Sequence, residues 1–163
     1  MLAALVREGK LPPVEERLPD PPLVLNTVDE IGVYGGELRR ALTGDIVQRP
    51  GVVKAMSESL LGWSRPIGSS IEPALAVSWS FEDEGRAATF HLRKHVRWSD
   101  GVPFTADDIL FYWDDMLFDE NARQGLLPPT RWVVDGEAIR LEKVDDYTIR
   151  FSSSKPLGRI MED

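Results

Sequence analysis

The chain has 163 residues, of which 42% are hydrophobic and 28% charged, and its 27 acidic and 19 basic side chains give a formal net charge of −8. This length suits one ordinary domain with a real core, and no apolar run approaches the ~20 residues that a membrane span requires. The negative charge argues against a nucleic acid as partner. The absence of cysteine excludes disulfides, thiolate nucleophiles and cysteine-ligated zinc, and it suits an oxidising extracytoplasmic space.

The first 30 residues are expected to form a region of their own. The start "MLAALVREGK" predicts one or two helical turns, and it lacks the basic and long apolar regions of an export signal. Five prolines follow in "KLPPVEERLPDPPLVLN", residues 10–26. Because proline fixes φ and removes a backbone donor, this stretch is predicted to run extended as a surface arm.

Two elements are expected between the arm and the middle of the chain. After the glycine pair of "GVYGGELRRAL", the residues from Glu37 to Leu42 could form a strand. In "VVKAMSESLLGW" the apolar positions Val53, Met56, Leu60 and Leu61 fit a helix that ends at Gly62.

The middle of the chain predicts two β-hairpins, over residues 76–93 and 137–152. In the first, Val77, Trp79 and Phe81 alternate with serines, which indicates a strand with one buried face. The sequence "EDEGR" supplies the turn, and "AATFHLR" repeats the alternation with Phe90 and Leu92. The second hairpin is expected to turn at Asp145-Asp146 and to bury a similar set of residues, namely Ile139, Leu141, Tyr147, Ile149 and Phe151.

A capped helix is predicted over residues 105–118, within "RWSDGVPFTADDILFYWDDM". Ser99-Asp100-Gly101 is typical of a turn, and Thr105 with Asp108 makes the acidic variant of a capping box. At ~100° per residue the apolar face contains Ile109, Tyr112, Trp113 and Met116, widened by Leu110 and Leu117. The opposite face contains four aspartates, and Phe111 and Phe118 lie among them, so something outside the helix should cover these two rings. The aspartates are Asp107, Asp108, Asp114 and Asp115.

Residues that could support catalysis are sparse. Paired carboxylates can hydrolyse glycosides, but here they belong to the solvent face of a capped helix. His91 and His95 lie four apart in a strand and its turn, where they share no face, so they are interpreted as structural or exposed. No serine has a base in view, no glycine-rich loop has phosphate-binding spacing, and no histidine stands at metal-ligand spacing among the acids. We therefore expect no enzyme activity, no cofactor and no metal.

Residues 73–116, "PALAVSWSFEDEGRAATFHLRKHVRWSDGVPFTADDILFYWDDM", resemble the signature region of the bacterial extracellular solute-binding proteins of family 5. These are the oligopeptide- and dipeptide-binding proteins of ABC importers. The family pattern has a Pro-x-Leu-Ala leader, an "SW" strand, a "TFHLR" strand, a "WSDG" turn and a "TADD" helix start, and all are present in order. The stretch "VDDYTIRFSSSKP" and the front stretches "GKLPPVEERLP" and "IGVYGGELR" are similar to family members as well.

The resemblance implies a mixed α/β (α+β) fold that forms part of lobe I of a two-lobed, type II periplasmic-binding-protein-like structure. Residues 1–30 would form the helix and the arm, and residues 31–163 would form the partial lobe, made of hairpins packed by helices. The second lobe would be absent from this chain. Family members close two lobes on a ligand held between them. By positional analogy the ligand-facing residues here are Asp45, Ile46, Val47 and Gln48, although an ordinary surface loop is an equal reading of them.

The implied function is the non-catalytic substrate-binding component of an ABC importer, which binds peptides or similar small solutes. Its partners would be that ligand and an ABC permease in the membrane. The full-length protein would be a monomer, located in the periplasm or outside the cell. Two alternatives remain at this point. One is a solute-sensing domain of a cytoplasmic regulator with the same fold, and the other is a carboxylate-based glycoside-processing enzyme.

Overall fold

The computed structural model describes residues 2–25, 27, 29–33, 35–37, 39, 58–64, 70–123 and 130–157. The chain divides into two compact units, one made of Met1–Leu23 with Ala76–Asp163 and the other of Val24–Leu75. Each unit is described by itself below.

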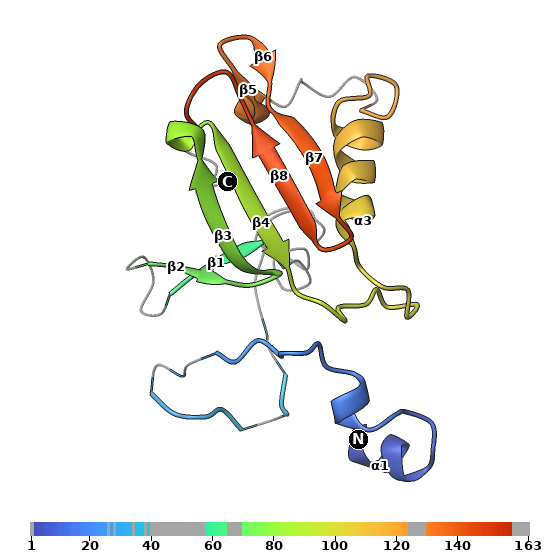
Figure 1. Cartoon of the computed structure of the whole chain (residues 1–163). Helices are drawn as coiled ribbons and strands as arrows, with labels where there is room; N and C mark the ends of the chain where they lie inside the picture. The colour runs from blue at the N-terminus through green and yellow to red at the C-terminus, as the bar shows by residue number, and fades with distance from the viewer. Residues whose placement is uncertain are drawn as a thin grey trace. The chain divides into compact units, whose positions relative to one another are not determined.

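The larger unit is built on a four-stranded antiparallel sheet with the strand order β3-β4-β8-β7 (Figure 1). Strands β3 (Ala76–Glu82) and β4 (Ala87–Leu92) form the first predicted hairpin, with the 3-10 turn η2 (Asp83–Gly85) between them. Trp79 stands opposite Phe90, and Phe81 stands opposite Ala88. The period-two pattern therefore predicted this hairpin correctly.

The second hairpin is also present, but its first strand begins later than predicted, and its turn lies one residue further along, so Tyr147 belongs to the turn and not to the strand. Strands β7 (Arg140–Asp145) and β8 (Thr148–Ser152) pair across a turn at Asp146-Tyr147. The prediction began this strand at residue 137, but Glu137–Ala138 form a separate strand, β6, that pairs with β5 (Val133–Val134). Their turn is Asp135-Gly136, both with positive φ, and an Asp-Gly pair is the signal for such a two-residue turn.

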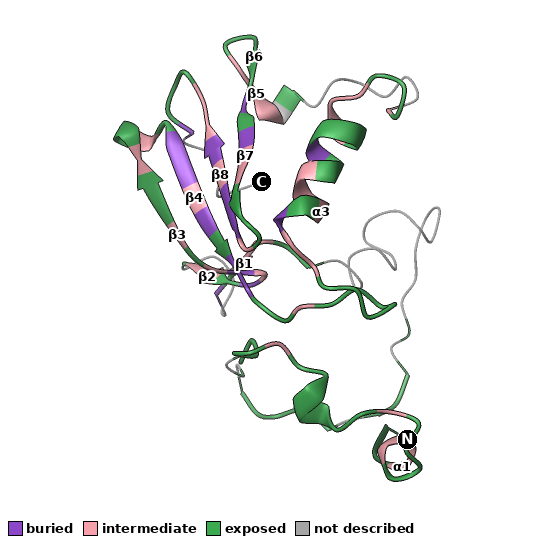
Figure 2. Cartoon of the chain, turned by 45° about the vertical axis from the view of Figure 1, so that its right-hand side comes forward, coloured by how far each residue is buried: buried purple, intermediate pink, exposed green. Residues whose placement is uncertain are grey.

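One face of the sheet forms the core of this unit. Phe90, Ile149 and Phe151 are buried on the two central strands, as Figure 2 shows for β4 and β8. The prediction that Val77, Trp79 and Phe81 have a buried face holds only in part, because Val77 and Trp79 are half-buried and Phe81 is 48% exposed. The reason is that β3 is an outer strand of this sheet, so it has a neighbour on one side only.

The predicted helix begins at Thr105, but it changes type half-way. The α-helix α3 (Ala106–Phe111) continues as the π-helix η3 (Tyr112–Leu117). A π-turn is wider than an α-turn, so the buried side shifts from the one that a period of 3.6 predicts. Trp113 is buried as expected, whereas Tyr112 and Met116, both predicted on the core face, are exposed.

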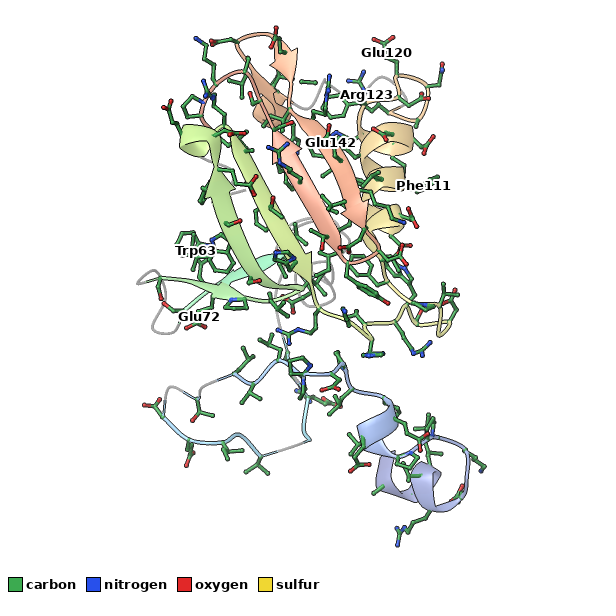
Figure 3. All side chains as sticks on the ribbon, in the orientation of Figure 1. Trp63, Glu72, Phe111, Glu120, Arg123 and Glu142 are labelled. Atoms are coloured by element: carbon green, nitrogen blue, oxygen red, sulfur yellow. The ribbon has the colours of Figure 1, made fainter. Side chains whose placement is uncertain are left out.

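Aromatic rings join this helix to the sheet. The ring of Trp113 lies 5.4 Å from that of Phe151, 5.0 Å from that of Trp132 and 5.2 Å from that of Phe118. Phe118 is therefore partly covered by Trp113, which belongs to the same helix and not, as the sequence predicted, to a part of the molecule outside it. Phe111 is 59% exposed and points away from the sheet (Figure 3). The expected cover for this ring is therefore not found among the described residues.

The opposite face of the sheet is polar. Ser80, Thr89, Arg150 and Glu142 stand opposite one another across the four strands. Arg150 is the centre of this row, because its guanidinium contacts Glu82 at 3.3 Å, Asp83 at 3.2 Å and Glu142 at 3.8 Å. One apolar and one polar face are typical of an antiparallel sheet packed on a single side.

The N-terminal segment of the larger unit has little regular structure. It begins with the helix α1 (Leu2–Arg7), which agrees with the predicted helical turns. Between residues 10 and 25 the structure contains the single 3-10 turn η1 (Val14–Glu16) and otherwise neither helix nor strand. No helix in the described part of the chain is long and apolar enough to span a membrane.

In the smaller unit, β1 (Leu61–Trp63) pairs with β2 (Ile71–Pro73) in an antiparallel arrangement. The helix predicted to end at Gly62 is wrong at that end, since residues 58–60 are not helical and Leu61–Trp63 form a strand. The backbone groups of β1 pair with β2 instead of with the preceding turn. The rest of that prediction, residues 52–57, lies outside the described residues, as does most of the strand predicted from Glu37 to Leu42.

Candidate binding site

The ligand-facing residues expected from the sequence, Asp45, Ile46, Val47 and Gln48, lie within residues 40–57, outside the described residues. Their role therefore stays a prediction.

The four helix aspartates, the second group of interest, either bond to neighbouring residues or face solvent. Asp107 accepts a 2.7 Å bond from Lys143 Nζ. Asp108 accepts from the backbone N–H of Thr105 at 2.7 Å and from Trp98 Nε1 at 3.0 Å, so it closes the predicted capping box. Asp114 and Asp115 are exposed. No group of three or more potential metal ligands occurs among the described residues.

A cleft of about 420 Å³ lies in the larger unit, where the end of the sheet meets the proline-rich arm. Three parts of the chain line it. Strands β3 and β4 and the residues after β4 contribute Val77, His91, Leu92 and Lys94; the β7–β8 turn region contributes Asp145, Tyr147 and Thr148; and the arm contributes Asp20 and Pro21. Its lining thus combines an apolar floor with charged side chains of both signs.

The arm is held at this place by a hydrogen bond from a buried side chain. Arg93, directly after β4, is 7% exposed, and its Nη1 donates to the carbonyl oxygen of Pro21. A charge-assisted bond of this kind is stronger than a neutral one. It fixes the wall of the cleft that Asp20 and Pro21 form.

The polar groups of the cleft are linked through Thr148. The His91 Nδ1 lies 3.3 Å from Thr148 Oγ1. The backbone N–H of Tyr147 donates to Asp145 Oδ1 at 2.7 Å, and this bond, helped by the Thr148 hydroxyl, lowers the pKa of the Asp145 carboxyl. Asp145 is therefore a carboxylate at neutral pH. Lys94 Nζ lies 5.6 Å from the centre of the Tyr147 ring, within the range of a cation–π contact.

The sequence did not single out this cleft. His91 was interpreted as structural or exposed, and it is both, since it faces solvent and contacts Thr148. The sequence predicted Asp145 in a turn and Tyr147 in a strand, and it assigned no role to Lys94. The sequence did not show that β4 pairs with β8, which brings residue 91 opposite residue 148. Two hairpins can be arranged side by side in several ways, so the hairpin signals alone could not predict this pairing.

Comparisons with known proteins match this architecture of hairpins and a capped helix. The family model of the bacterial extracellular solute-binding proteins, family 5 Middle, matches residues 70–161. The periplasmic alpha-galactoside-binding protein of Rhizobium meliloti (strain 1021) is 35% identical over 94% of this chain and 24% of that protein. The dipeptide-binding protein of Escherichia coli (strain K12) is 28% identical over 58% of this chain and 20% of that protein.

Solved structures give the same result at nearly full coverage of the chain. A structure of the oligopeptide-binding protein OppA has a TM-score of 0.83 and 42% identity, and it covers 98% of this chain and 24% of that one. The periplasmic binding protein MelB of Agrobacterium fabrum C58, in complex with stachyose, has a TM-score of 0.75 and 32% identity over 94% of this chain and 26% of that one. The chain spans about a quarter of the length of these relatives.

The mixed α/β fold is that of periplasmic binding proteins. Because the family model covers more than half of the sequence, the chain belongs to the bacterial extracellular solute-binding proteins of family 5.

Proposed function

We propose that this chain is part of the substrate-binding component of an ABC importer, and that residues 31–163 belong to its N-terminal lobe. The observation that carries the proposal is the family match over residues 70–161, together with structural matches that extend over at least 94% of the chain. In this role the protein captures a small solute between two lobes, closes on it and delivers it to a membrane permease. It works as a monomer on the periplasmic or extracellular side, and it catalyses no reaction.

The ligand is an oligosaccharide or a short peptide. Relatives named for each class match almost the whole chain, since the alpha-galactoside-binding protein and the stachyose complex cover 94% of it and the oligopeptide-binding protein covers 98%. The four residues from Asp45 to Gln48 are proposed to contact this ligand. Their carboxylate and amide groups can bond either sugar hydroxyls or peptide groups.

The test is calorimetric titration of the protein expressed from its whole reading frame with stachyose, with a tripeptide and with maltose as an unrelated sugar. Saturable binding of stachyose or of the tripeptide, weakened by Asp45→Ala and Gln48→Ala but not by Asp115→Ala, supports the proposal. Failure of both ligands to bind, or hydrolysis of stachyose during the titration, would overturn it. Detection of the protein in the cytoplasmic fraction alone would contradict the proposed location.

A further inference from the structure

We propose that the cleft between the sheet end and the arm is a second ligand site, which takes a small zwitterion of the size of a free amino acid. This inference goes beyond the proposed function, because the solute captured between two lobes would bind elsewhere. It rests on the charges, the shape and the fixed walls of the cleft.

The cleft contains one cation and one carboxylate whose charged groups make no direct hydrogen bond or ion pair with a described residue. Lys94 Nζ makes no direct ion pair with a described residue; it contacts the Tyr147 ring, and its charge also helps to lower the pKa of the Asp145 carboxyl from a longer distance. Asp20, on the arm side, likewise has no hydrogen-bond or ion-pair partner within the described ranges. A ligand with an ammonium and a carboxylate group would satisfy both side chains at once.

Ligands with a single charge fit less well. A simple anion attracted to Lys94 would also meet the carboxylates of Asp20 and Asp145, and a simple cation attracted to these two would meet Lys94. Like charges brought together cost affinity. A molecule that is neutral overall but carries both charges avoids either repulsion, provided that its ammonium faces Asp20 and Asp145 and its carboxylate faces Lys94.

The size and the apolar lining suit the rest of such a molecule. Small-molecule sites enclose roughly 300–1,000 Å³, and this cleft of about 420 Å³ is near the lower end of that range. Val77 and Pro21 offer hydrocarbon surface for an aliphatic side chain. Because Arg93 holds Pro21 in place and Asp145 is fixed by the Tyr147 N–H, two walls are set before a ligand arrives, which lowers the entropic cost of binding.

The experiment titrates the protein expressed from its whole reading frame with L-leucine, and with acetate and methylammonium as probes of one charge each. We expect saturable L-leucine binding that Lys94→Met and Asp20→Asn each weaken about tenfold or more, as loss of a charged hydrogen bond predicts. Lys155→Met is the matched control, because that lysine pairs with the exposed Asp135 at 3.8 Å, away from the cleft lining. In the same titration followed by NMR, the imidazole signals of His91, identified by their loss in His91→Gln, should shift.

Three outcomes would overturn the inference. Absence of saturable binding up to the solubility limit of L-leucine would show that the cleft takes no amino acid. Equal binding of acetate would show a simple anion site. Binding of L-leucine that is the same in Lys94→Met and Asp20→Asn as in the unmodified protein, with no shift at His91, would locate the amino acid elsewhere in the protein.

Discussion

At the scale of single residues, the hydroxyl of Thr89 controls the ionisation of Glu82 on the polar face of the sheet. Thr89 Oγ1 donates to Glu82 Oε1 at 2.6 Å. This bond is the main cause that lowers the pKa of the Glu82 carboxyl below its usual 4.5, and Arg150 lowers it further. Hydrogen bonds and positive charges both favour the ionised form of a carboxyl.

The pH dependence of stability should therefore change in Thr89→Val. Since the pKa of Glu82 is lower in the folded state, its ionised form stabilises the fold above pH 4.5, and this contribution is lost as the pH falls through the lower folded value. In Thr89→Val the free energy of unfolding should decrease less steeply between neutral pH and about pH 3. Urea unfolding at a series of pH values measures this, with Ser78→Ala on the same strand as control. Equal slopes in the three proteins would contradict the assignment.

Arg150 should contribute more to stability than other arginines of the sheet. Its guanidinium stands between Glu82, Asp83 and Glu142, so Arg150→Met would leave three carboxylates facing one another. We expect this change to lower the free energy of unfolding by about 1–3 kcal/mol. The matched control is Arg140→Met, which loses one 3.9 Å pair with Glu142 on an exposed side chain and should cost about 0–1 kcal/mol. Equal losses in urea unfolding would show that the Arg150 contacts add nothing.

At the scale of elements, the start of the helix depends on Asp108. Its carboxylate accepts from the Thr105 backbone and from Trp98 Nε1, so it ties the helix to the preceding turn. Asp108→Ala should lower the free energy of unfolding by about 1–2 kcal/mol, as loss of a cap does. Asp115→Ala, on the exposed side of the same helix, should stay within about 0.5 kcal/mol of the parent. Chemical denaturation followed by tryptophan fluorescence measures both, and equal effects would mean that the cap is not formed in solution.

The elements that the sequence predicted well are those whose signals are local. The alternation of Phe90 and Leu92, the Asp100-Gly101 turn and the Thr105 cap each depend on residues within a few positions, and all three are present. The exposure of Tyr112 and Met116 was missed because a π-turn has no simple period in the sequence. The strand at Leu61–Trp63 was missed because its partner, Ile71–Pro73, lies further along the chain and leaves no signal within the strand itself.

The candidate cleft follows the same division between local and distant information. The sequence predicted a turn at Asp145 with Tyr147 just after it, but not that the arm at Asp20 and Pro21 lies beside them. The contact depends on Arg93, whose partner is 72 residues away along the chain. Distant contacts of this kind come from the packing of whole elements, which no short motif encodes.

At the scale of the whole molecule, large apolar side chains face solvent in the described residues. They include Phe81 on β3, Phe111 and Tyr112 on the helix, and Trp98 in the turn before the helix. Each large apolar side chain left in water forgoes roughly 1.5–3 kcal/mol relative to burial. That amount is a large share of the ~5–15 kcal/mol by which a typical domain is stable. The chain also spans only about a quarter of the length of its relatives.

We therefore expect the 163-residue chain, taken alone, to be marginally stable and to bind a hydrophobic dye. It should also bind neither stachyose nor a tripeptide, whereas the protein expressed from its whole reading frame binds one of them. Phe111→Ser should reduce dye binding with little loss of stability, because that ring is 59% exposed. Phe118→Ser is the contrasting variant and should destabilise the fold, because its ring packs 5.2 Å from that of Trp113. Dye fluorescence, a thermal melt and calorimetric titration measure these effects. A sharp cooperative melt together with saturable micromolar binding by the short chain would show that it is a complete binding module, and that the ligand does not require a second lobe.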